Sequence, residues 1–101
     1  MVKKLEDMDP KTLRTFIDDA KNRIGSGVVV VGTTAEGKVF LAAGVTKDLV
    51  DRFHAGNILK EIAAIVGGSG GGRPDMAQAG GTQPEHLDQA LQRVFEIVGG
   101  K

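Results

Sequence analysis

The residues best suited to chemistry lie in one stretch of fifteen, GGSGGGRPDMAQAGG, from Gly67 to Gly81. Three glycines, Gly70, Gly71 and Gly72, directly precede Arg73. Successive unhindered backbone N–H groups can form a concave nest for an anion, and a guanidinium offers a planar fork that matches phosphate. The stretch therefore predicts a tight, amide-rich loop over 67–72 with Arg73 beside it, suited to a nucleic-acid backbone. The alternative, that the glycines only permit tight turns and close packing, stays open from these residues alone.

Other glycine-rich motifs do not fit this stretch. A dinucleotide-binding fingerprint places its glycines between a strand and the following helix, whereas these glycines follow a helical pattern, and no GK[ST] phosphate loop is present. A flexible linker favours Gly and Ser throughout, but RPDMAQAGG contains a proline and an apolar alternation. We expect a short strand around 76–79, with Gly80 and Gly81 allowing close backbone approach before the last helix.

Four further cations are candidates for the same anion contact: Lys38, Lys47, Arg52 and Lys60. Each of them alone is equally compatible with a solvated surface role, since any surface of this composition carries exposed cations. The chain has 13 basic and 13 acidic residues, so a nucleic acid must be met by a local patch and not by a global positive field. Four phenylalanines, placed mostly on apolar faces, favour contacts to phosphate and ribose over base stacking.

Catalytic and metal-binding patterns are poorly supported. The chain has no cysteine, which excludes disulfides and thiolate ligands and fits a reducing cytosol. His54 and His86 stand far apart in the sequence and predict capping or exposed roles. Asp48, Asp51 and Asp75 resemble an acid–base set without a nucleophile, and Asp75 after Pro74 is typical of a turn. We therefore expect no catalysis, no metal and no effect of chelators on folding or binding.

The elements that must position these residues follow from periodicity and capping. One small domain is expected for 101 residues, and no apolar run approaches a membrane span. Helices are predicted from Asp9 to Gly25, from about 57 to 66, and from Thr82 to Gly99, with a helical turn capped by Thr46 between them. Fully apolar strands are predicted at 28–31 and 38–43, and a weaker one at 2–5.

The expected fold is a single α/β domain with a mixed sheet of about four strands covered by helices, in the order β-α-β-β-α-β-α. The turn TTAEG between the two apolar strands is short, which makes them an antiparallel hairpin at the centre of the sheet. These strands lack polar alternation, so each needs cover on both faces.

The glycine motif carries a resemblance. Together with GVTKDLVDRFHAGNILKEIAAIVGG upstream, GGGRPDMAQAGG resembles the C-terminal globular domain of bacterial alanyl-tRNA synthetases, and the likeness extends over essentially the whole chain. That domain is related in fold to the accessory domain of DHH-type phosphoesterases, where a Gly-Gly-Gly-His motif contacts substrate phosphate. Arg73 stands here where that histidine would be, which weakens a phosphoesterase reading.

The resemblance implies a C-terminal tRNA-binding domain over 1–101 that contacts the tRNA elbow and helps couple aminoacylation and editing. It implies tRNA(Ala) and the other synthetase domains as partners, a homodimer formed through the parent, no membrane or DNA partner, and a cytoplasmic location. The parent would be an alanine–tRNA ligase using ATP, magnesium and zinc, whereas this fragment would need no cofactor and would not catalyse. The alternatives are a dimerisation or interaction module, the substrate-binding lobe of a DHH-family phosphoesterase, and a free-standing editing protein.

Overall fold

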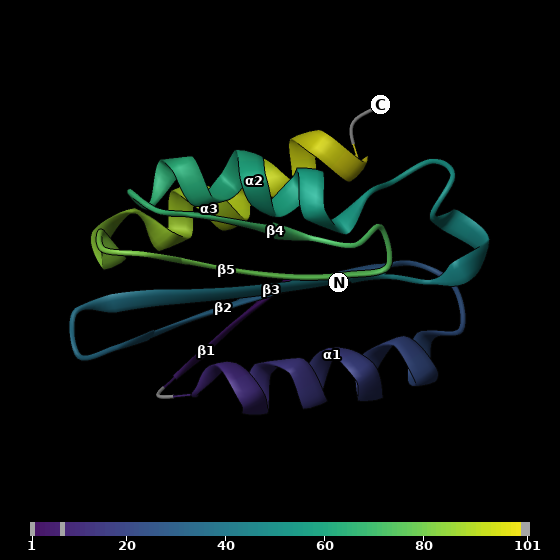
Figure 1. The fold of residues 1–101 in the computed structure, drawn as a ribbon, viewed down its shortest axis with the longest axis horizontal. Coiled ribbons are helices and arrows are strands. Elements are labelled where there is room, and N and C mark those ends of the chain that lie inside the picture. Colours follow the sequence, from purple (N-terminus) through teal and green to yellow (C-terminus); the bar gives the residue numbers. More distant parts are fainter. Residues whose placement is uncertain (1, 7, 100–101) are drawn as a thin grey trace.

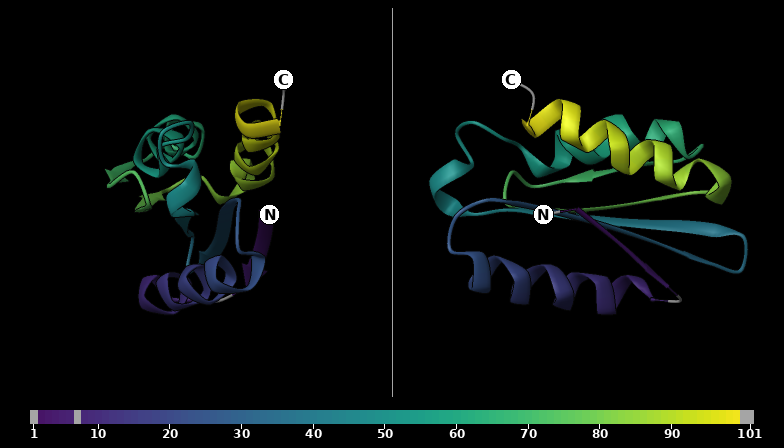
Figure 2. Two further views of the ribbon diagram at one scale, coloured as in Figure 1. Left: turned by 90° about the vertical axis from the view of Figure 1, so that its right-hand side faces the viewer. Right: turned by 180° about the vertical axis from the view of Figure 1, so that it is seen from behind.

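A computed structural model describes residues 2–6 and 8–99, which form three layers: one helix, a five-stranded sheet, and two helices (Figure 1). The helices are α1 (Pro10–Ile24), α2 (Ala55–Ile65) and α3 (Leu87–Val94), and the strands are β1 (Val2–Glu6), β2 (Val28–Ala35), β3 (Lys38–Val45), β4 (Ser69–Gly72) and β5 (Met76–Gly81). Turned by 90°, the molecule shows α1 on one side of the sheet and α2 and α3 on the other (Figure 2). Among the described residues, no helix is long and apolar enough to cross a bilayer.

The sheet is mixed, in the order β1-β2-β3-β5-β4. β1 runs parallel to β2, and every other neighbouring pair is antiparallel. Glu36 and Gly37 connect β2 to β3, with positive φ angles of 53° and 78°. Two such residues make the tight turn whose twist matches the flanking strands, so the predicted hairpin is confirmed and lies inside the sheet.

The four valines of β2 explain why the sheet is covered on both faces. Val29 and Val31 pack with α1, whereas Val30 packs with α2 and α3, because successive side chains of a strand point to opposite faces. All three of these side chains are completely buried. The prediction that this strand needs cover on both faces is confirmed.

Helix α1 begins and ends where the sequence predicts. The Asp9 side chain accepts a hydrogen bond from the Thr12 N–H at 2.7 Å, Pro10 occupies the first turn, and Gly25 ends the helix with φ +74°. Leu13 and Ile17 of the predicted apolar stripe are completely buried. Local capping and periodicity are sufficient to define this helix.

The predicted fold class is confirmed, with differences at three places. The sheet has a fifth strand, β4, because Ser69–Gly72 pairs with Gly80–Ala77 of β5 instead of forming a loop. Helix α2 begins at Ala55, two residues before the predicted start. The last helix begins at Leu87 after a 3-10 turn, Pro84–His86, because the Thr82 and Gln83 N–H groups donate to the Val66 carbonyl and hold that segment to the end of α2.

Thr46 does not cap the 3-10 turn Lys47–Leu49 in the predicted way. Its hydroxyl donates to Asp48 Oδ1 at 2.6 Å and accepts from the Gly27 N–H at 2.9 Å. Ser26 donates to the other oxygen of the same carboxylate at 2.5 Å. These two hydroxyls hold the pKa of Asp48 below its ordinary value of 3.8, so Asp48 is ionised at neutral pH and joins the two ends of the β2–β3 hairpin.

Candidate nucleic-acid interface

Arg73 lies in the turn between β4 and β5, and that turn is fastened by its backbone. The Arg73 N–H donates to the Met76 carbonyl at 2.9 Å, and the Arg73 and Pro74 carbonyls accept from the Gly56 and Ala55 N–H groups at 3.3 Å and 2.9 Å. The side chain is 69% exposed, with Nε 3.6 Å from Asp75 Oδ1. This separation is too long for a hydrogen bond, so the guanidinium keeps its donors for an external anion on a rigid base.

The predicted glycine nest is wrong in its geometry. Ser69–Gly72 is extended, so successive N–H groups point in opposite directions instead of converging on one anion. The glycines are required by close approach: a Cβ on Gly70 would lie 2.3 Å from Ala79 Cβ, and one on Gly68 would lie 1.7 Å from the Gly80 carbonyl oxygen. The packing interpretation of these two glycines is therefore favoured, and any anion contact must come from side chains.

The first turn of α2, next to Arg73, does not provide the missing N–H groups. The Ala55 and Gly56 N–H groups are used by the β4–β5 turn, and the Asn57 N–H donates to His54 Nδ1 at 3.1 Å. An anion at a helix N-terminus needs free N–H groups there. Consequently this helix end is already satisfied, and His54 has the capping role expected from the sequence.

Arg14 was not among the residues predicted for the site, yet it shares a shallow hollow with Arg73. The hollow is lined by Arg14, Gly71, Gly72, Arg73, Met76, Ala77 and Gln78. Gln78 Nε2 donates to the Pro10 carbonyl at 2.8 Å, which holds the start of α1 beside β5. Arg14 is exposed on α1. Nothing in the local sequence links α1 to the glycine stretch, so only the fold reveals this pair of arginines.

Lys47 extends the positive patch along the same end of the sheet. It lines a second hollow together with Lys21, Asn22, Gly25, Thr46, Asp48 and Asp75. Lys21 Nζ donates to the Asp75 carbonyl at 3.1 Å, which brings the end of α1 to the β4–β5 turn. Arg73 and Lys47 therefore both border on Asp75, and we name Arg14, Lys21, Lys47 and Arg73 the basic rim.

The structure does not gather the other predicted cations at this rim. Lys38 borders Gly67, Gly68 and Ser69, where β4 begins and β5 ends, whereas Arg73 lies where β4 ends and β5 begins. Arg52 lies over the Phe53 ring, 5.8 Å from its centroid, and lines another hollow with His54. Lys60 is exposed on α2, away from the ends of that helix. Only Lys47, Arg73, Gly71 and Gly72 of the predicted set lie at one end of the sheet.

The titratable groups do not form a metal site within residues 2–6 and 8–99. No group of three or more His, Asp or Glu side chains there is placed to hold a metal ion. His86 Nδ1 lies 3.2 Å from the Ile65 carbonyl and 3.0 Å from Gln83 Oε1, contacts that position the 3-10 turn before α3. Both histidines have structural partners instead of a shared ligand.

A three-layer domain with a mixed sheet and a positively charged end of that sheet has close known counterparts. The family model described as "DHHA1 domain" matches residues 1–100, and the chain belongs to this family. It is 56% identical over 91 residues to an alanine–tRNA ligase of Desulfosudis oleivorans, a match covering 90% of this chain and 10% of that protein. The chain therefore spans about a tenth of the length of this curated relative.

The fold is also similar to a solved structure, the C-Ala domain of the alanyl-tRNA synthetase from Aquifex aeolicus. The TM-score is 0.91 with 30% sequence identity, and the match covers 98% of this chain and 89% of that one. The resemblance drawn from the glycine motif to the C-terminal domain of alanyl-tRNA synthetases is thus confirmed in sequence and in fold.

Proposed function

We propose that this chain is the tRNA-binding C-terminal domain of an alanine–tRNA ligase. The observation that carries the proposal is the 56% identity over 90% of the chain to a region of such a ligase. The fold supports it, since the C-Ala domain superposes over 98% of the chain. The parent would join alanine to tRNA(Ala) with ATP and magnesium, use zinc in editing, and work in the cytoplasm, whereas this domain would bind without catalysing.

The basic rim is the surface that would meet the RNA. Formal charge on the whole chain is zero, so attraction must be local, and Arg73 and Arg14 together line one hollow at the sheet end. An exposed guanidinium can bind a phosphate through two parallel N–H groups. Contacts to phosphate position an RNA without reading its bases, which suits recognition of the tRNA elbow by shape.

Coupling of aminoacylation and editing would follow from this placement. A domain that holds the elbow while joined to the catalytic and editing domains keeps one tRNA within reach of both centres. The other synthetase domains are then its protein partners, and a homodimer would form through them. Because the chain spans only a tenth of its relative's length, these roles belong to the proposed parent.

A titration of the chain with tRNA(Ala) at several salt concentrations tests the proposal. We expect log affinity to fall linearly with log salt, because neutralised phosphates release counterions. A second tRNA species should bind with a comparable slope if contacts are to phosphate alone. Absence of binding to any tRNA at low salt would reject the proposal.

An interaction module is a second candidate, and one observation favours it. The glycines of β4 are explained by backbone packing, and Phe95 is 54% exposed beside Ile97 and Val98 on the last helix. Sedimentation of the chain with and without tRNA distinguishes the two candidates. A concentration-dependent dimer that does not bind tRNA would support this second function, whereas a monomer that binds tRNA would reject it.

A free-standing editing protein and the substrate-binding lobe of a DHH-family phosphoesterase are distinguished by the parent gene. In a phosphoesterase a catalytic Asp-His-His half precedes the domain, and in a synthetase the ligase and editing domains do. Sequencing the gene upstream of the codon for Val2 decides among them.

A further inference from the structure

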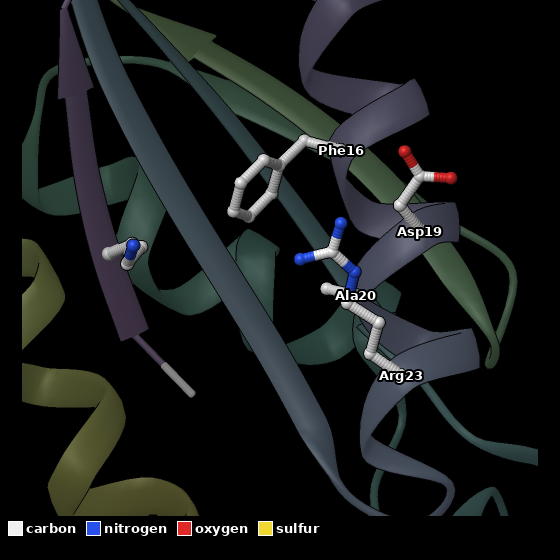
Figure 3. A pocket seen from close by; sticks show the side chains of 5 residues that line it. Phe16, Asp19, Ala20 and Arg23 are labelled. Atoms are coloured by element: carbon white, nitrogen blue, oxygen red, sulfur yellow. The ribbon is translucent and has the colours of Figure 1, made fainter.

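A pocket between α1 and β1 lies apart from the basic rim. It is lined by Lys3 from β1 and by Phe16, Asp19, Ala20 and Arg23 from α1. Figure 3 shows the Arg23 guanidinium and the Phe16 ring pointing toward one another, with the Asp19 carboxylate turned away. This pocket and the Arg14–Arg73 hollow both border α1, one beside β1 and the other beside β4 and β5.

The aromatic ring in this pocket is accessible. Phe16 packs against the α1 side of the core but is only partly buried, and none of the four phenylalanines, all of them described, is in the fully buried core. The ring and the nearly buried Ala20 methyl give the pocket an apolar wall. The sequence-based expectation that the phenylalanines are taken up by the core, leaving none for stacking, does not hold for Phe16.

The cations of the pocket are free within the described residues. Lys3 and Arg23 are exposed and have no carboxylate within ion-pair distance there, whereas Arg93 pairs with Glu61 and Glu96, and Lys4 pairs with Asp88 at 3.1 Å. Asp19 is the single acidic residue lining the pocket. The pocket therefore carries unpaired positive charge next to an accessible ring.

The size of the pocket restricts what can enter. Its volume is about 170 Å³, and a water molecule occupies about 30 Å³ whereas drug-sized ligands fill about 300–1,000 Å³. The space suits one planar ring with an anionic group at its mouth. Unstacked RNA bases bind proteins in this way, by stacking on Phe or on an Arg plane while cations hold the phosphate.

We propose that this pocket holds one unstacked nucleobase of an RNA between Phe16 and Arg23, with Lys3 and Arg23 facing the adjoining phosphate. The inference rests on the proposed function for the identity of the RNA. It adds a base contact, on the β1 side of α1, to the phosphate contacts of the basic rim.

NMR titration of the chain tests the pocket without depending on tRNA. Cytidine 5′-monophosphate should shift the Phe16 ring and Arg23 side-chain resonances through the ring current of the base, whereas ribose 5-phosphate and inorganic phosphate should not move the Phe16 ring. Equal shifts with all three ligands would identify a simple anion site and overturn the proposal. No shift with the nucleotide would overturn it as well.

Variants then test the contact on tRNA. Phe16→Leu keeps an apolar side chain and should weaken tRNA binding about 5- to 150-fold, the range for loss of one base–aromatic stack. Lys3→Gln and Arg23→Gln change exposed residues and should weaken binding while the melting temperature stays unchanged. Lys4→Gln is the matched control: it removes the same charge from the next residue of β1, whose side chain pairs with Asp88 of α3, and it should leave binding unchanged.

The outcomes separate this inference from the proposed function. If wild-type chain binds tRNA and the three pocket variants bind it equally well, the pocket proposal fails and the tRNA-binding function stands. If wild-type chain binds no tRNA, the tRNA-binding function fails, and the nucleotide titration alone decides whether the pocket accepts a base.

Discussion

The two hairpins of the sheet are built by opposite means. The β2–β3 hairpin is held by side chains: Val30, Val31 and Leu41 are buried on its two faces, and Asp48 joins its ends through two hydroxyls. The β4–β5 hairpin is held by backbone contacts at positions without side chains, since added Cβ atoms at Gly68 and Gly70 would collide with β5. One hairpin is specified by what its residues carry, and the other by what they lack.

This difference assigns different tasks to the two regions. The valine hairpin forms the centre of the core and can tolerate little change in volume. The glycine hairpin places Arg73 at the end of the sheet, 69% exposed, on a turn fixed by α2. A region that spends few side chains on packing is free to present a cation to a partner, and the following changes test that distinction.

Leu41→Ala should have the largest effect. Leu41 is 1% exposed in the cluster beneath α2 and α3, and emptying such a site costs about 2–5 kcal/mol in free energy of unfolding. Urea denaturation followed by circular dichroism measures it. Lys38→Ala, at the exposed start of the same strand, should change stability by less than about 0.5 kcal/mol. Equal losses for both variants would contradict a hairpin held by buried side chains.

Gly70→Ala should destabilise the glycine hairpin by about 1–3 kcal/mol, because the new methyl group would overlap Ala79. Amide hydrogen exchange should accelerate in β4 and β5 more than in β2. Gly80→Ala, in the same hairpin, is the control, since the nearest atom to its Cβ would be the Val39 carbonyl oxygen at 3.3 Å. A fully stable Gly70→Ala variant would show that close approach does not explain this glycine.

Arg73→Ala should affect binding and leave folding unchanged. Loss of a charge-assisted phosphate contact should weaken tRNA affinity by about 1–3 kcal/mol, similarly for all tRNA species, and lower the salt slope by about one counterion. Thermal melts and tRNA titrations on one sample distinguish the two effects. A lower melting temperature with unchanged affinity of the folded fraction would make Arg73 a structural residue paired with Asp75.

Asp48→Asn should give the smallest effect, and one that depends on pH. The Ser26 and Thr46 hydroxyls lower the pKa of Asp48 in the folded chain, so its contribution to stability is present above the ordinary value of 3.8 and is lost as pH falls through the lowered pKa. The difference in free energy of unfolding between wild type and Asp48→Asn should therefore shrink as pH falls below that value.

The control for this variant is Asp51→Asn, since Asp51 has no hydrogen-bond or ion-pair partner among residues 2–6 and 8–99. It should match wild type across the same pH range. A difference for Asp48→Asn that stays constant down to the lowest measurable pH would show that the carboxylate does not join the ends of the hairpin through its charge.

The sequence by itself determined the elements whose signals are local. Asp9, Pro10 and Gly25 define α1 because capping and backbone preference act over a few residues. The unbroken valines predicted a strand buried on both faces, and the glycine motif with Arg73 identified the family before any contact was known.

Only the tertiary structure decided what the glycines do and which cations meet. Gly68–Gly72 carry no side chains, so their strand conformation depends on a partner, β5, and on α2 packed above them. Arg14 and Arg73 share one hollow because the Gln78 side chain holds the start of α1 beside β5. Such contacts join residues distant in sequence, and no local periodicity or propensity encodes them.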